Sequence, residues 1–273
     1  MSRIGLIVLF TLALTGLAAF GTTSGQAGGD KGTAWKTFIP DQAYEELTRR
    51  SLERIGALGR SDKGLGDLRA EALVLAGYTV SAKDGPSKIP LRHSAVVLAT
   101  LLEQKDGADA ARKLAAALAA GNVGDKGDPV KDWRAVIGDV NDVMILVATK
   151  ARKGEGIHAD LQYNDKMKKQ NGVEALINAL AAKKLTDANL GKMSKELELL
   201  AYRVATIGAL TLRRGPSEKK KGVDDRLWEE QAIAMRDAAI EWAEGARKND
   251  GPAVFEACKR LENTCVECHS KFK

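Results

Sequence analysis

Aromatic residues and proline are scarce in this chain. Aromatic side chains make up 5% of the 273 residues, and proline occurs only six times. Runs of Val, Ile, Thr and Tyr, which favour strands, are also rare, whereas Ala and Leu recur throughout. Because Ala and Leu are strong helix formers, this composition predicts an all-α fold. A hydrophobic content of 44% and a charged content of 29% are typical of a soluble globular protein and exclude a disordered one.

Long apolar runs are missing except at the start of the chain. Arg3 precedes an apolar run over 4–20, and small residues follow as far as Ala27. This order is typical of a secretory signal peptide, so we expect 1–27 to be removed and the mature protein to be soluble and periplasmic, or otherwise exported. The run is about 17 residues long, the lower limit for a membrane span, so an uncleaved anchor is the alternative. In either case the rest of the chain works outside the cytoplasm.

A strong excess of one charge is also absent. The formal net charge is +6, and loss of 1–27 would remove only Arg3 from the basic residues. Lysines cluster at 166–169 and 219–221, in sequence typical of loops. Solvated loops are the simplest interpretation of both clusters, and docking of an acidic redox partner is the alternative. Export argues against nucleic acid as a partner.

Gly, Pro, Asn and Asp signals divide the chain into helical segments from about residue 41 onward. The expected helices are 43–58, 65–81, 91–104, 108–120, 130–150, 173–182, 186–212 and 224–247, then a last helix with Pro252 in its first turn. A polar linker at 121–129 separates the first four from the rest, and similar Asp-Gly and Gly-Pro-Ser signals recur in both halves. We therefore expect two tandem four-helix-bundle-like domains, at 28–125 and 126–273. A single irregular helical domain is the alternative.

Cysteine is rare, and its three occurrences lie close together near the C-terminus. Cys265, Cys268 and His269 form a C-x-x-C-H sequence, which is the attachment signal for haem c. Two thiols at this spacing can add to the two vinyl groups of one porphyrin, and the following imidazole can reach the iron. We expect one haem c on Cys265 and Cys268, with His269 as axial ligand. A dithiol oxidoreductase normally has a βαβ pattern, a zinc site would need Cys258 as a fourth ligand, and a disulfide would leave His269 unexplained.

Only four residues follow His269, so the rest of a haem pocket must come from upstream, as a four-helix bundle allows. The chain resembles the class II cytochromes c, the cytochrome c-prime family, in its ending 265–273, which has the pattern C-x-x-C-H-x-x-aromatic-basic. Leu227-Trp228 matches an apolar-Trp pair that opens the family's third helix. The resemblance is specific over 250–273, loose over 130–249, and does not cover the first half. It implies that Lys273 lies near the haem, where the family usually has Arg.

The resemblance also implies that the first helix of the haem bundle lines the other face of the iron. A methionine there gives six-coordinate iron and electron transfer, whereas an apolar residue leaves five-coordinate iron that binds nitric oxide or carbon monoxide. Met144, on the expected helix 130–150, is the first candidate for the distal ligand, and core filling is the alternative. His158 and Met167 are weaker candidates. The first half has no thiols to attach a haem.

These features predict a periplasmic mono-haem c-type cytochrome that transfers single electrons. One alternative is a five-coordinate haem protein that binds nitric oxide or carbon monoxide. Another is a haem-bearing subunit whose first half docks to a larger redox complex. The expected partners are thus a redox protein or a small gas, and the family analogy allows a homodimer. The residues form no acid–base or nucleophilic constellation, so we do not expect an enzyme.

Overall fold

The computed structural model describes 35–61, 64–124, 127, 130, 132–148, 154, 156–216 and 224–272. Apart from one isolated bridge between Ile39 and Ala82, these residues form helices and loops, which confirms the all-α prediction. The helices are α1 (Asp41–Gly59), α2 (Leu65–Ser81), α3 (Lys88–Leu101), α4 (Ala108–Ala119), α5 (Trp133–Ile137), α6 (Asn141–Met144), η1 (Ile145–Val147), η3 (Ala159–Leu161), α7 (Asp165–Gln170), α8 (Val173–Ala182), α9 (Asp187–Arg214), α10 (Asp225–Arg247) and α11 (Gly251–Phe272).

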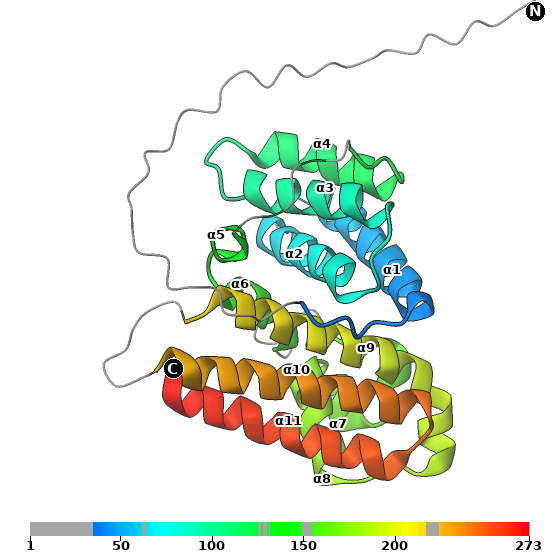
Figure 1. The fold of residues 1–273 in the computed structure, drawn as a ribbon. Helices are drawn as coiled ribbons and strands as arrows, with labels where there is room; N and C mark the ends of the chain where they lie inside the picture. Colours follow the sequence, from blue (N-terminus) through cyan, green and yellow to red (C-terminus); the bar gives the residue numbers. More distant parts are fainter. Residues whose placement is uncertain are drawn as a thin grey trace, which may run out of the picture. The chain divides into compact units, whose positions relative to one another are not determined.

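The first four helices pack on one another in a ring. Helix α1 contacts α2 and α4, while α3 contacts the same two helices from the other side (Figure 1). Tyr44, Leu47 and Ile55 give α1 a buried stripe at helical spacing. In contrast, every residue of α2 from Leu68 to Thr79 is buried. A helix that is apolar all round must be covered on all sides, and α9 covers the side of α2 that α1 and α3 leave open.

The second group consists of α8, α9, α10 and α11. The long helices follow one another side by side, α9 on α10 and α10 on α11, and α8 packs on α11 (Figure 1). The predicted start of α9 is confirmed, since the Thr186 hydroxyl accepts the Asn189 N–H at 3.4 Å. Asp224 caps α10 in the same way by accepting the Arg226 N–H. Pro252 lies in the first turn of α11, as predicted.

Helix α9 belongs to both groups because it contacts α2 on one side and α10 on the other. Two glycines allow these close approaches. A Cβ on Gly77 of α2 would lie 2.5 Å from a methyl group of Thr206, and a Cβ on Gly208 of α9 would lie 2.9 Å from the backbone nitrogen of Arg236. Residues 35–273 form one compact unit. The predicted division into two bundles is not tested by this packing, and the boundary at 125–126 lies outside the described residues.

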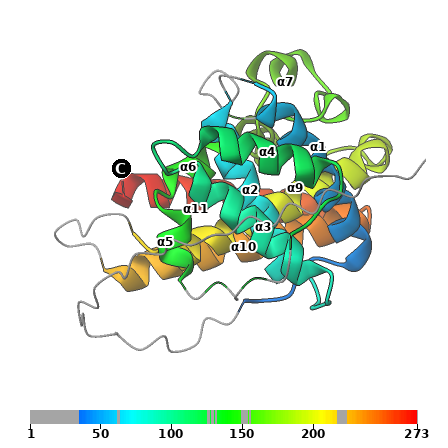
Figure 2. The same ribbon diagram turned by 90° about the horizontal axis from the view of Figure 1, so that it is seen from above.

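The single helix predicted over 130–150 is wrong. Its described residues form two short helices, α5 and α6, followed by the 3-10 turn η1. Helix α5 ends at Gly138, whose φ of +63° favours glycine and interrupts the helix. The apolar spacing that suggested one helix is satisfied equally well by short segments packed on α2 and α9. Figure 1 and Figure 2 both place α5 and α6 at the end of this unit where α11 ends.

The predicted signal peptide, 1–27, lies outside the described residues. Within the part of the chain that the structure describes, every helix is either too short or too polar to span a lipid bilayer.

Candidate cofactor site

Helix α11 carries one stripe of residues, spaced alternately by four and three positions, that faces the other helices. Its members are Val254, Cys258, Leu261, Cys265, Cys268 and Phe272. The first three are fully buried, at most 2% exposed, whereas the last three are only half-buried. The stripe therefore runs from the core to the surface, and the two thiols of the C-x-x-C-H sequence lie where it becomes accessible.

The thiols of Cys265 and Cys268 are both free and lie on the same face of α11, one turn apart. Burial raises the pKa of Cys265 to about 12, and the charges of Cys268, Glu174 and Glu262 add to this effect. Burial also raises the pKa of Cys268. Both groups are thus neutral thiols near pH 7. A redox-active dithiol needs a lowered thiol pKa, so the electrostatics of this pair do not favour the oxidoreductase alternative.

Cys258 lies on the same stripe, two turns before Cys265, which is about 10 Å along the helix axis. Its side chain is completely buried, and burial raises the pKa of its thiol. In the described part of the chain, no three His, Cys, Asp or Glu side chains come together in a way that could hold a metal ion. The four residues considered for zinc are all described, so they do not form such a site.

The end of α11 is fixed to α10 and α9 through aromatic residues. The ring of Phe272 packs edge-on against the ring of Trp228, with centroids 4.9 Å apart and an interplanar angle of 88°. The indole N–H of Trp228 donates to the backbone carbonyl of Thr211 at 2.9 Å. His269 lies on the last turn of α11 with an exposed side chain. Lys273, expected near the haem, lies outside the described residues.

Met144 also reaches this end of the structure. It closes the short helix α6 and is half-buried, with its sulfur 3.5 Å from the Thr211 hydroxyl. The same hydroxyl also donates to the carbonyl oxygen of Ile207 at 2.9 Å, and since it has one proton, the sulfur and the carbonyl oxygen share it. Thr211 thus links Met144 to Trp228, and Trp228 contacts Phe272.

The other candidates for the distal ligand lie elsewhere. Met167 is completely buried in the core on α7. Met193 of α9 and Met235 of α10 are also buried in the core. His158 is half-exposed and lies 3.3 Å from Asp160 and 3.8 Å from Glu196, so it belongs to a different cluster.

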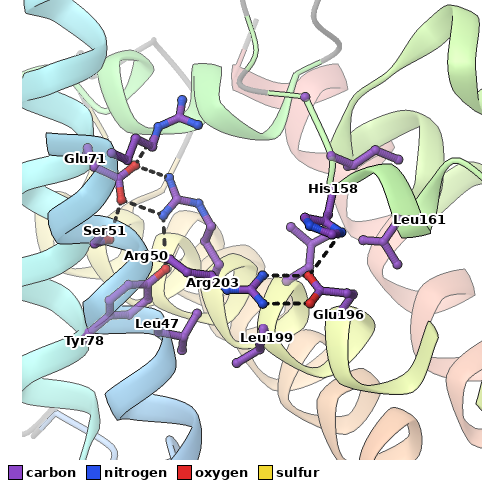
Figure 3. A pocket seen from close by; sticks show the side chains of 14 residues that line it. Leu47, Arg50, Ser51, Glu71, Tyr78, His158, Leu161, Glu196, Leu199 and Arg203 are labelled. Atoms are coloured by element: carbon purple, nitrogen blue, oxygen red, sulfur yellow. Dashed lines mark hydrogen bonds and ion pairs between the residues drawn. The ribbon is translucent and has the colours of Figure 1, made fainter. Parts of the chain in front are cut away.

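That cluster lines a cavity of about 310 Å³ between α1, α2, α9 and the segment around η3 (Figure 3). Arg203 forms two hydrogen bonds to the Glu71 carboxylate, at 2.6 and 3.1 Å, and Ser51 donates a third. Burial alone would raise the pKa of Glu71, but the charges of Arg203 and Arg54 outweigh it and hold the pKa below its ordinary value. Each of the two lining glutamates faces an arginine, while the lining contains three arginines, Arg50, Arg54 and Arg203.

The second ion pair of this cavity joins α1 to α9. Arg50 donates to both oxygens of Glu196, at 2.6 and 2.7 Å (Figure 3). Sequence reasoning missed the cluster because its residues come from separate elements with no fixed spacing. A signal was present, since Arg203 stands in the middle of an otherwise apolar helical run and an apolar run follows Glu71 directly.

The residues at the end of α11 fit a covalently held haem by their donor chemistry. Two neutral thiols on one half-buried face are followed at once by an imidazole, and the rings of Phe272 and Trp228 pack together at the same end of the helix. Cys258, by contrast, is enclosed by the core. The structure therefore distinguishes the two cysteines of the motif from the third.

Comparison with known proteins identifies no relative. No protein-family model matches the chain, and no curated protein or solved structure does. The resemblance to the class II cytochromes c thus rests on the C-terminal motif and on Trp228.

Proposed function

We propose that this protein is an exported mono-haem c-type cytochrome that transfers single electrons. The observation that carries the proposal is the face of α11 on which Cys265 and Cys268 lie. The stripe that builds the core upstream becomes half-buried at these two thiols, and His269 follows directly. A prosthetic group attached there would be covered by protein on one side and accessible at its edge.

Cys265 and Cys268 would form the attachment. Each thiol adds its S–H across one porphyrin vinyl group, so that sulfur bonds to one vinyl carbon and hydrogen to the other. The one-turn separation of the thiols on a single face suits a pair of bonds to one ring. Cys258 is excluded from this role because its thiol is completely buried.

His269 would hold the iron on one side, and Phe272 and Trp228 would keep water from the site. Haem c, when bound, supplies an iron that alternates between the ferric and ferrous states. Met144 is the proposed ligand on the other side of the iron, supported by its position beside Thr211, which also binds the indole of Trp228. A thioether ligand stabilises ferrous iron and suits electron transfer.

Binding of nitric oxide or carbon monoxide at an open site is the second candidate function. It is favoured by the packing of Met144 against the hydrophobic core, which is the usual role of a helical methionine. If Met144 serves the core, the iron keeps an open position.

Visible spectra of the matured protein test the choice between these functions. We expect the reduced protein to be low-spin and unchanged by carbon monoxide. Met144→Leu, which conserves volume, should give a reduced protein that binds carbon monoxide at once. Met235→Leu is the matched control, a buried helical methionine on α10, and should leave the spectrum unchanged. A wild-type protein that is high-spin and binds carbon monoxide immediately would overturn the electron-transfer proposal and favour gas binding.

A further inference from the structure

We propose that Arg69 of α2 is a positioning residue that holds the α5–α6 segment, and with it Met144, at the end of α11. The inference rests on the proposed function. It gives the first four helices, which carry no cysteine, a role in a site to which they contribute no ligand.

Arg69 is buried, with 5% of its surface exposed, and its guanidinium binds the segment at three points. Its Nη1 donates to Asp142 at 2.7 Å, while its Nη2 lies 3.0 Å from the carbonyl oxygen of Ile137 and 3.2 Å from that of Val136, which share its protons with Glu103. Asp142 lies two residues before Met144 on the same short helix. A fourth hydrogen bond joins Arg69 to Glu103, which lies outside the segment.

The α5–α6 segment needs such external support. Helices α5 and α6 contain five and four residues, far fewer than a helix needs to be stable by itself. Their positions must therefore come from tertiary contacts. Arg214, at the end of α9, provides a second one by donating to the carbonyl oxygen of Gly138. Arg134 of α5 donates in turn to the carbonyl oxygen of Arg214 at 2.9 Å.

Gly138 shows that the backbone is shaped around this guanidinium. A Cβ at this position would lie 2.8 Å from a terminal nitrogen of Arg69 and 2.5 Å from a carboxylate oxygen of Glu103. Its φ of +63° is also one that L residues rarely adopt. The same glycine thus ends α5 and leaves room for Arg69 beside the chain.

Arginine suits this position better than lysine would. Its planar group presents five N–H donors in a fixed fork and remains charged, whereas a lysine has a single point of attachment. Two carboxylates, Glu103 and Asp142, balance its charge. One side chain can therefore fix both a carboxylate on α6 and two carbonyl groups at the end of α5.

Two carboxylate variants distinguish the effect of Arg69 on the position of the α5–α6 segment from the effect of neutralising its charge. Asp142→Asn weakens a bond between Arg69 and α6, while Glu103→Gln, the matched control, weakens a bond that does not involve the segment. Arg69→Lys keeps the positive charge and tests whether the planar guanidinium group is needed. Each should be studied in the full chain with haem, and in the chain carrying Cys265→Ala and Cys268→Ala without haem.

Hydrogen exchange of 133–148 is the readout in the haem-free protein. We expect Asp142→Asn and Arg69→Lys to speed exchange there about tenfold, and Glu103→Gln to leave it near wild type. In the haem protein, Asp142→Asn and Arg69→Lys should also let carbon monoxide bind faster or shift the reduction potential. Glu103→Gln should do neither. Equal exchange in all three variants would overturn the inference. So would faster exchange with no change at the iron. Failure of haem attachment would refute the proposed function, yet the exchange result would still decide whether Arg69 holds the segment.

Discussion

The three cysteines of α11 differ in their accessibility to solvent. Cys258 and Cys265 occupy equivalent positions of the stripe, seven residues apart, but only Cys265 lies where the stripe reaches the surface. The chemistry available to each thiol is set by this difference rather than by the sequence around it. Attachment of a prosthetic group requires an accessible thiol, so the burial of Cys258 restricts the site to the motif.

Alkylation of the haem-free protein should follow the same order. We expect iodoacetamide to modify Cys265 and Cys268 in the folded protein, and Cys258 only after unfolding. Because burial raises the pKa of Cys265 to about 12, its reaction should be slow at pH 7 and accelerate about tenfold per pH unit toward pH 10. Peptide mass spectrometry measures each site. Equal rates at Cys258 and Cys265 would contradict the burial argument.

The buried ion pair of Glu71 and Arg203 contributes to the stability of the folded protein. Glu71→Gln should lower the free energy of unfolding at pH 7 by about 3–5 kcal/mol, because it removes the carboxylate charge that the buried Arg203 guanidinium binds. Glu53→Gln, which alters an exposed pair on α1, is the matched control and should have little effect.

The pH dependence of this effect has a definite sign. The pKa of Glu71 is lower in the folded protein than its ordinary value of 4.5, so its contribution is present above that value and is lost as the pH falls through the folded pKa. The stability gap between wild type and Glu71→Gln should therefore narrow as the pH falls below about 4.5. Urea unfolding from pH 7 to 3 measures it, and a gap that widens in acid would refute this account.

Among the elements, α9 has the most demanding position because helices pack on both sides of it. Gly208 lets α10 approach, since a Cβ there would lie 2.9 Å from the backbone of Arg236. Gly191, on the same helix, has nothing within 4 Å of a Cβ. Packing, rather than helix propensity, should thus decide how each glycine tolerates alanine.

Replacing these two glycines should give opposite results. Gly191→Ala should stabilise the protein by up to about 1 kcal/mol, the difference in helix propensity. Gly208→Ala should destabilise it by about 1–3 kcal/mol because the backbone of α10 has to move. Thermal unfolding of the two variants measures the difference. Stabilisation by Gly208→Ala would mean that α9 and α10 are not packed as closely as described.

Helix boundaries were predictable where local signals act alone. The ranges expected for α2 and α8 agree with the structure, because Gly64 and Gly85-Pro86 flank the first segment and Asn171-Gly172 precede the second. The expected helix over 130–150 was wrong because its break at Gly138 depends on Arg69 and Arg214, which are remote in sequence. Apolar spacing reports burial, but it does not report whether the backbone between buried residues continues as one helix.

At the scale of the whole molecule, two sites occupy different regions of one compact unit. The cavity around Glu71 joins α1 and α2 to α9, and both of its glutamates are paired with arginines. The candidate cofactor site lies at the end of α11, where α6, α9 and α10 also contribute residues. The motif at this end was visible in the sequence because its three residues are adjacent. Its surroundings were not, since Thr211, Trp228 and Met144 meet only through the packing of separate helices.

The central claim, covalent haem on Cys265 and Cys268, is tested most directly by the mass of the intact protein. The chain should be produced with the machinery for haem c maturation, denatured, and extracted with acidic acetone before mass spectrometry. We predict that the wild-type protein keeps the added mass of one haem, and that the Cys265→Ala, Cys268→Ala double variant keeps none. Cys258→Ala should retain the haem, because its thiol is buried. A wild-type protein that loses all its porphyrin on extraction would contradict the account.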